Sequence, residues 1–327
     1  MANVTKKRVC VTGGTGFLGS WTIKRLLEDG YSVNATVRLH PDQKRDISYL
    51  TNLPGAAERL QIFSADLDEP DTFAAAIKGC DGVFHMAHPL DFAEKDTEEV
   101  KLKRVTTALR TILRACADSK SVRRVVYTSS ISAALFSAAA VPEDENSWTD
   151  VELIRSLNTF GGAYVVTKTV AERAAVDLAA ELDLDLVSVL PTWITGPFIC
   201  PNLPDTVHIS MALINGDKGH YQHLKEASLV HVDDVARAHI HLLEYPAAKG
   251  RYIVAAAQFT IQELSHFLAA KYPHYQMPSP DLWKDVTAVK SSGLSTKKLE
   301  ATGFKYENGL DEMFDDAIKA CKEKGLM

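Results

Sequence analysis

The sequence lacks the features that define several classes of protein. Its five cysteines are scattered, with no C-x-x-C pair and no histidine spacing typical of a zinc site, so neither a disulfide framework nor a structural metal is predicted. No apolar run approaches the roughly 20 residues that span a bilayer, and the basic first residues form no signal-peptide core. We therefore expect a cytoplasmic protein without a membrane span.

The sequence also lacks an excess of positive charge. Lys and Arg number 36 against 42 Asp and Glu, and this net charge of −6 argues against nucleic acid or an anionic membrane as the main partner. Residues 1–60 are an exception, because they hold nine Lys and Arg against five acidic residues. This local excess suits a small anionic ligand near the amino end, or else an ordinary solvated surface.

The 327 residues are long enough for one large domain or two modest ones. Short runs rich in β-branched residues alternate with longer helical patterns through the first 190 residues. This alternation predicts parallel strands joined by crossover helices, which is a doubly wound α/β sheet of the Rossmann type. The predicted strands are 8–12, 32–37, 60–64, 82–87, 123–129 and 184–190, and the predicted helices are 16–28, 71–77, 98–117 and 162–182.

The regular pattern fades after Pro191. Prolines and glycines interrupt residues 191–204, which predicts irregular structure followed by scattered helices. We expect an NADP-binding domain over 1–190 and a smaller substrate-binding lobe over 191–327. A helical pattern at 232–244 either packs back on the first domain or belongs to the second lobe.

A glycine-rich turn follows the first predicted strand and leads into a helix. Gly13, Gly16 and Gly19 have G-x-x-G-x-x-G spacing. Glycine permits a tight turn and lets backbone N–H groups approach a pyrophosphate, while the helix N-terminus supplies positive potential. The context of strand, turn and helix therefore predicts dinucleotide binding.

The residues after the second predicted strand bear on the choice of cofactor. NAD is typically bound by an acidic residue about 20 residues beyond the glycines, whereas the 2′-phosphate of NADP requires Arg or Lys. Arg38 follows this strand directly, and the first acidic residue after the strand is Asp42. Lys44 and Arg45 come just beyond it. We therefore expect NADP(H), with Arg38 as the principal phosphate ligand and Lys44 as the second.

Polar residues also follow two other strands at the edge where such sheets bind ligands. Asp66, followed by Leu67, comes after the third strand and either accepts a hydrogen bond from the adenine amino group or caps the next helix. The fifth strand ends in three hydroxyl residues. Ser130, the last of them, is our candidate to orient a substrate carbonyl, in preference to Ser129 and Thr128, since alternation along the strand sends Ser129 to the opposite side.

Reduction of a carbonyl needs a proton donor, and a tyrosine can serve if a nearby cation lowers its pKa. A Lys four residues further along a helix lies on the same face as the Tyr. Three pairs have this spacing: Tyr164/Lys168, Tyr221/Lys225 and Tyr245/Lys249. Pro246 disfavours helical geometry at Tyr245, and Tyr221 lies in a polar stretch that predicts a surface loop. Tyr164 begins a strong helical pattern and is therefore the predicted donor, with Lys168 lowering its pKa.

Several segments together resemble the extended short-chain dehydrogenases/reductases, and within them the plant dihydroflavonol-reductase group. The likeness spans nearly the whole chain. The segments that carry it are 12–20, 83–87, 127–130, Tyr164-x-x-x-Lys168, 190–192, 230–236 and 314–325.

The resemblance implies NADPH-dependent ketone reduction in specialised plant metabolism. It implies Ser130, Tyr164 and Lys168 as the catalytic triad, Pro191 near the nicotinamide, and a substrate cleft between the lobes. With the glycine turn, the candidate cofactor-binding residues are Gly13, Thr15, Gly16, Phe17, Leu18, Gly19, Arg38, Lys44, Asp66, Leu67, Ala87 and Pro191.

Two positions depart from the pattern of that group. His88 stands where relatives carry a small hydroxyl residue before a proline. It either donates to a substrate oxygen, replaces part of the usual proton relay or is structural. Leu135 stands where flavonoid-reducing members present Asn, which predicts an apolar pocket and weakens the case for a flavanonol substrate. The candidate substrate-contacting residues are His88, Leu90, Leu135 and Trp193.

The leading prediction is a carbonyl reductase that acts on a bulky cyclic ketone, flavonoid-like, isoflavonoid-like or an alkaloid. The same residues could oxidise an alcohol or hemiacetal, because sequence does not set direction. A dinucleotide-binding sensor without turnover is an alternative of another class, which the presence of all three triad residues disfavours. Epimerisation of a sugar nucleotide is a further alternative, but the apolar surroundings predicted for the pocket favour a ring system.

Overall fold

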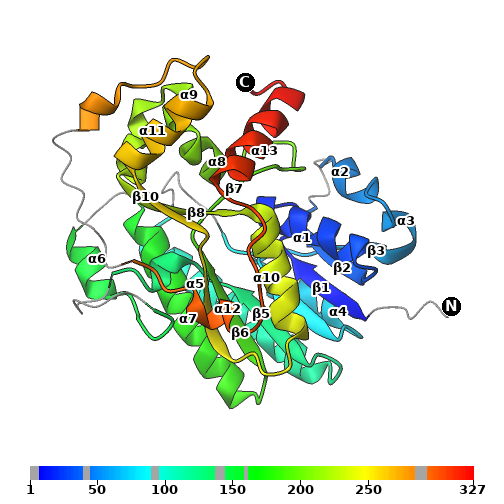
Figure 1. The fold of residues 1–327 in the computed structure, drawn as a ribbon. Coiled ribbons are helices and arrows are strands. Elements are labelled where there is room, and N and C mark those ends of the chain that lie inside the picture. Colours follow the sequence, from blue (N-terminus) through cyan, green and yellow to red (C-terminus); the bar gives the residue numbers. More distant parts are fainter. Residues whose placement is uncertain (1–6, 40–44, 90–95, 137–143, 158–160, 284–292) are drawn as a thin grey trace.

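The computed structural model describes residues 7–39, 45–89, 96–136, 144–157, 161–283 and 293–327 (Figure 1). Two predicted site residues, Lys44 and Leu90, lie outside these ranges. None of the helices within them is both long enough and apolar enough to cross a membrane.

A seven-stranded sheet forms the centre of the molecule. Its order is β3-β2-β1-β4-β5-β6-β9, and every neighbouring pair is parallel. The strands are β1 (Arg8–Thr12), β2 (Ser32–Val37), β3 (Leu60–Ser64), β4 (Gly82–His85), β5 (Arg124–Thr128), β6 (Leu186–Pro191) and β9 (Gly250–Val254). The predicted doubly wound sheet is confirmed. The order reverses between β1 and β4, and the glycine turn leaves β1 there.

Helices cover both faces of this sheet because strand side chains alternate between two apolar clusters. Val9 and Val11 of β1 pack with residues of α1 (Phe17–Glu28) and α10 (Val232–Glu244). Cys10, between them, packs with residues of α5 (Glu98–Asp118) and α7 (Gly162–Glu181). The helix predicted at 232–244 therefore packs back on the large sheet.

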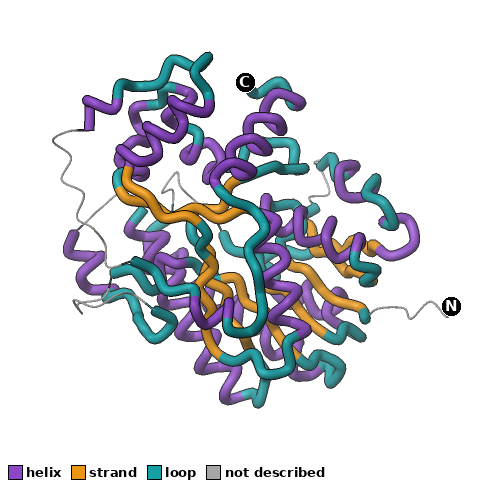
Figure 2. The backbone as a smooth tube through the Cα atoms, viewed as in Figure 1, coloured by secondary structure: helices purple, strands orange, loops and turns teal. Residues whose placement is uncertain are grey.

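The second sheet has three strands in the order β10-β8-β7, with β8 parallel to β7 and antiparallel to β10. Figure 2 shows these short strands beyond one end of the large sheet, with helices gathered around them. The strands are β7 (Trp193–Thr195), β8 (Glu226–His231) and β10 (Ala257–Thr260). None of the three was predicted, because the prolines and glycines after Pro191 indicate irregular structure followed by helices.

The remaining elements are short, apart from two helices of the smaller lobe. That lobe holds α8 (Asp205–Ser210), α9 (Ala212–Asn215), η3 (Lys218–Leu224), α11 (Ile261–Lys271), η4 (Pro280–Trp283) and α13 (Leu310–Glu323). Elsewhere lie α2 (Ser48–Thr51), α3 (Ala56–Arg59), η1 (Pro70–Phe73), α4 (Ala74–Ile77), η2 (Ile131–Ala133), α6 (Val151–Leu157) and α12 (Lys297–Glu300). Residue 190 is no clean boundary, since α10 and β9 come after it and belong with the large sheet.

Candidate active site

The glycine turn brings the start of α1 against the end of β1. Gly13 has φ +73°, a conformation that favours glycine, and its amide oxygen accepts a 3.0 Å hydrogen bond from Gly16 N. A Cβ at Gly19 would overlap that oxygen, so the helix can approach the turn only with glycine there. The N–H groups of the first turn of α1 have no partner within the helix, and this bare backbone fits a pyrophosphate.

The predicted phosphate ligand follows the strand that this turn contacts. Gly14 N donates to Thr36 O at 2.9 Å, which ties the turn to β2, and the exposed Arg38 follows that strand by one residue. Residues 37–39 contain no acid. Asp66, the predicted adenine partner, accepts a 3.1 Å hydrogen bond from Asp68 N through its side chain. This contact closes a turn, and the N-cap residue of the next helix, η1, is Glu69, so Asp66 does not cap that helix. The adenine role of Asp66 stays a prediction.

Thr12 fixes the end of β4. Its hydroxyl oxygen lies 3.0 Å from both Met86 N and Ala87 N and 2.9 Å from His85 Nδ1. Since both backbone N–H groups donate, the single hydroxyl hydrogen is left to donate to Nδ1, and the His85 proton sits on Nε2. Burial lowers the pKa of His85 to about 3, which keeps the ring neutral. The contacts of Thr12 and His85 were not predicted, although both residues fall within segments that resemble the short-chain dehydrogenases/reductases.

Tyr164 lies in the first turn of α7, just after Gly161, which has φ +80°. The Ser130 side chain lies near enough to Tyr164 to lower the pKa of its hydroxyl, and Ser130 Oγ accepts a hydrogen bond from Ser132 N at 3.2 Å. Burial nevertheless raises the pKa of Tyr164 above its ordinary value, and the Ser130 contact only opposes that rise. The expected lowering of this pKa is therefore not found in this arrangement.

Lys168 lies one turn further along α7 and is buried. Its Nζ donates to Thr128 O at 3.1 Å, at the end of β5. Burial lowers the pKa of Lys168 to about 8, and the nearby Glu172 opposes this change. Ser130, Tyr164 and Lys168 thus come together at the carboxyl ends of the strands, as the sequence predicts. Their catalytic roles stay predictions.

The other two hydroxyls at the end of β5 bind elsewhere. Thr128 Oγ1 lies 2.8 Å from His239 Nε2 of α10, and Ser129 Oγ donates to Glu172 at 2.7 Å. Each of them therefore ties β5 to a helix. Of the three, Ser130 is the one whose hydroxyl lowers the pKa of Tyr164, which agrees with the choice of Ser130 made from the sequence.

Glu172 also belongs to a buried ion pair that sequence reasoning missed. Its carboxylate accepts hydrogen bonds of 2.9 and 3.1 Å from Arg251 of β9. Arg251 donates to Ala133 O at 3.3 Å and stacks 3.8 Å from the ring centroid of Trp148. The pair therefore joins β9 and the segment after Ser130 to the helix of Tyr164. The one sequence signal was an acid four residues beyond Lys168.

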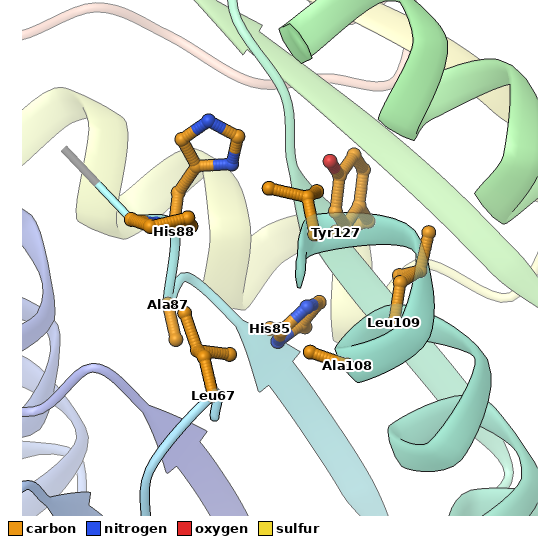
Figure 3. A pocket seen from close by; sticks show the side chains of 9 residues that line it. Leu67, His85, Ala87, His88, Ala108, Leu109 and Tyr127 are labelled. Atoms are coloured by element: carbon orange, nitrogen blue, oxygen red, sulfur yellow. The ribbon is translucent and has the colours of Figure 1, made fainter. Parts of the chain in front are cut away.

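A small pocket adjoins this site (Figure 3). Leu67, Ala87 and His88 lie on one side of it, and Tyr127 of β5 and Leu109 of α5 face them. The His88 ring meets the Tyr164 ring edge to face, with centroids 6.0 Å apart and an interplanar angle of 86°. Burial and the charge of Lys168 hold the pKa of His88 well below its usual range, so the ring is neutral. The structure therefore places His88 beside the predicted proton donor.

The remaining predicted residues lie in other packing clusters. Leu135 packs with the cluster that contains Leu190, and Pro191 ends β6 opposite Val254 of β9. Trp193 begins β7, with its ring 6.1 Å from that of His223. Their contacts with cofactor or substrate stay predictions.

Comparison with known proteins decides the family. Residues 9–256 match the NAD dependent epimerase/dehydratase family. The chain belongs to this family. It is 49% identical to vestitone reductase of Medicago sativa over 323 residues, which cover 98% of this chain and 99% of the relative. The solved structure of that alfalfa enzyme matches with a TM-score of 0.88 and 47% identity, over 98% of this chain and 100% of that one.

Other members of the family are also similar over nearly the whole chain. Dihydroflavonol 4-reductase of Zea mays is 44% identical over 98% of this chain and 90% of its own length. Noscapine synthase SDR1 of Papaver somniferum is 43% identical over 99% of this chain and 94% of its own length. The protein is thus an extended short-chain dehydrogenase/reductase of the dihydroflavonol-reductase group, and an NAD(P)-dependent oxidoreductase that acts on carbonyl groups.

Proposed function

We propose that this enzyme uses NADPH to reduce a bulky cyclic ketone of plant specialised metabolism, flavonoid-like, isoflavonoid-like or an alkaloid. One observation carries the proposal: Tyr164 lies near enough to Ser130 for that hydroxyl to lower its pKa, and one helical turn before the buried Lys168. This is the arrangement that protonation of a carbonyl oxygen requires. Bound in the glycine turn, NADPH supplies the hydride.

The chain's own groups divide the remaining work. Ser130 donates a hydrogen bond that orients the substrate carbonyl, and Tyr164 passes its phenolic proton to the oxygen. Tyr164 must lose a proton although burial raises its pKa, so the positive charge of Lys168 stabilises the phenolate that forms. Glu172 favours the charged form of that lysine, and its ion pair with Arg251 holds the carboxylate in place.

The choice of NADPH over NADH rests on the end of β2. Arg38 is exposed and follows β2 directly, and Lys44 lies further along the same connection, outside the described residues. A guanidinium binds a phosphate through paired charge-assisted hydrogen bonds, whereas a ribose hydroxyl gains little from it. Residues 13 and 15–19, at the start of α1, would hold the pyrophosphate of the bound cofactor, and Ala87 and Pro191 would contact its nicotinamide end.

Substrate recognition falls to residues around Tyr164 and in the smaller lobe. His88, neutral and in contact with the Tyr164 ring, can donate a hydrogen bond to a second substrate oxygen. Leu135, Trp193 and Leu90 supply apolar surface, which suits a fused ring system better than a diphosphosugar. The relatives named for vestitone, dihydroflavonol and noscapine support this substrate range.

A panel of ketones tests the proposal. NADPH oxidation is followed with vestitone, a dihydroflavonol, a flavanone and alkaloid ketones, while quenching of NADPH fluorescence measures cofactor binding separately. We expect at least one ring ketone to be consumed in equal amount with NADPH. Tight NADPH binding without oxidation of the cofactor by any ketone would overturn the reductase proposal and favour a sensor.

The direction of reaction needs its own test, because the same residues serve alcohol oxidation. The alcohol product of the panel is incubated with NADP⁺ across a range of pH. We expect reduction to be faster at neutral pH. Oxidation of alcohols or hemiacetals without any ketone reduction would make the enzyme a dehydrogenase instead.

A further inference from the structure

Three side chains with metal-binding atoms gather in the smaller lobe, outside the site described above. His208 lies on α8, Asp217 precedes η3 and caps it, and His220 lies within η3. His208 Nε2 is 3.0 Å from Asp217 Oδ2, and His220 Nε2 is 3.8 Å from the same oxygen. The three ligand atoms all lie within 4.8 Å of one another.

These separations are close to those of a zinc site. Zn²⁺ is held tetrahedrally at about 2.0–2.1 Å from each nitrogen or oxygen, which places neighbouring ligand atoms about 3.3 Å apart. The 3.0 and 3.8 Å distances lie on either side of that value. Small side-chain rotations at half-buried residues would therefore bring all three atoms into coordination.

Asp217 is held with one oxygen facing the histidines, and the His220 ring is free to adjust. Asp217 uses its other oxygen, Oδ1, to accept a 3.1 Å hydrogen bond from Gly219 N, which aims Oδ2 at the histidines. The rings of His208 and His220 are perpendicular, at 89°, with centroids 5.2 Å apart. Within the described part of the chain, His220 Nδ1 is buried without a hydrogen-bond partner, so no other contact through this nitrogen fixes the ring.

We propose that His208, Asp217 and His220 bind one Zn²⁺ ion, with water in the fourth position. Two imidazoles and one carboxylate suit zinc. They do not suit Mg²⁺ or Ca²⁺, which prefer ligand sets made up of oxygen atoms. The ion links α8 to η3, and so stabilises the lobe that carries Trp193. Sequence spacing did not reveal the site, because the intervals of nine and three residues match no common zinc motif.

Calorimetric titration of the full chain, without a histidine tag, with ZnCl₂ tests the site. We expect one ion per chain, and at least tenfold weaker binding in His208→Ala and in His220→Ala. His266→Ala is the matched control, because His266 is an exposed histidine on α11, and it should bind zinc as the unaltered chain does. Zinc should also raise the melting temperature of the control but not of the two site variants, and a chelator should reverse the rise.

Two features keep the test decisive. His220→Ala retains the His208–Asp217 hydrogen bond, so it separates loss of a ligand from loss of a structural contact. Melting without zinc confirms that each variant is folded. Absence of binding, or equal affinity in His220→Ala, His208→Ala and the control, would overturn the proposal and leave only adventitious surface binding.

Discussion

The carboxyl edge of the large sheet and the smaller lobe hold their polar groups differently. At the edge, Lys168, Glu172 and His85 are buried, and each has hydrogen-bond partners that fix its position. In the smaller lobe, His208 and His220 are half-exposed. An unpaired buried charge is costly, so the edge must be assembled before any ligand arrives, whereas the lobe can adjust to one. The carboxyl edge of the sheet therefore suits catalysis, and the smaller lobe suits recognition of a ligand.

The largest effect should come from the phenol at the edge. Tyr164→Phe removes the proton donor while keeping the ring that contacts His88. Proton transfer by a placed side chain contributes about 10²–10⁴-fold, so we expect kcat to fall by roughly that factor. Steady-state kinetics on an accepted ketone measures this, with NADPH affinity as the internal control. Undiminished turnover would show that the edge does not supply the proton.

The buried ion pair should determine stability more than any pair at the surface. Glu172→Gln leaves Arg251 buried without its counter-charge, which typically costs about 3–5 kcal/mol of unfolding free energy. Glu152→Gln is the control, because Glu152 is 80% exposed and its pair with Arg155 contributes about 0–1 kcal/mol. Urea unfolding compares the two variants. Similar losses in both would mean that burial does not distinguish the edge from the surface.

Substitution of Arg38 should change the preference for NADPH over NADH without loss of the catalytic step. Arg38→Ala removes a charged hydrogen bond worth about 1.5–3 kcal/mol, so NADPH should bind roughly ten- to a hundredfold more weakly. NADH binding should stay the same, because it offers no 2′-phosphate to the guanidinium. Fluorescence titration with both cofactors gives the ratio. An unchanged NADPH to NADH ratio would remove Arg38 from the cofactor site.

The mildest effect should be a pH dependence set by Lys168. Its pKa is lowered to about 8, so the ammonium form is complete well below pH 8 and is lost as pH rises through that value. If the cation supports proton donation, kcat/KM should be constant near pH 6.5 and fall by at most about tenfold per pH unit above 8. A profile that rises through pH 8 would contradict this role for the ammonium.

The large sheet could be predicted from the sequence because its signals are local. The observed bounds of β1, β2 and β3 are those predicted, and the context of Tyr164 singled out one of three Tyr-Lys pairs. In the smaller lobe, strands β7, β8 and β10 are defined by pairing across distant segments. Tyr221, predicted on a surface loop, is instead buried in η3, where its ring packs 5.4 Å from that of Trp283.

Parts of the site were hidden for the same reason. Glu172 and Arg251 are 79 residues apart in the chain, and Thr12 and His85 are 73 apart, so neither contact leaves a local pattern. The raised pKa of Tyr164 could not be predicted either, because it depends on burial by the assembled lobes rather than on the spacing to Lys168. The spacing of residues along a helix shows which charged groups lie near one another, but it does not show how deeply they are buried.

Hydride transfer at the sheet edge is tested most directly by isotopic labelling. The ketone that is consumed fastest is reduced with NADPH that carries deuterium at the transferred C4 position, and the alcohol is analysed by mass spectrometry and NMR. The account predicts one deuterium on the carbinol carbon and none elsewhere. Alcohol without label at that carbon would contradict direct transfer from the cofactor to the carbonyl.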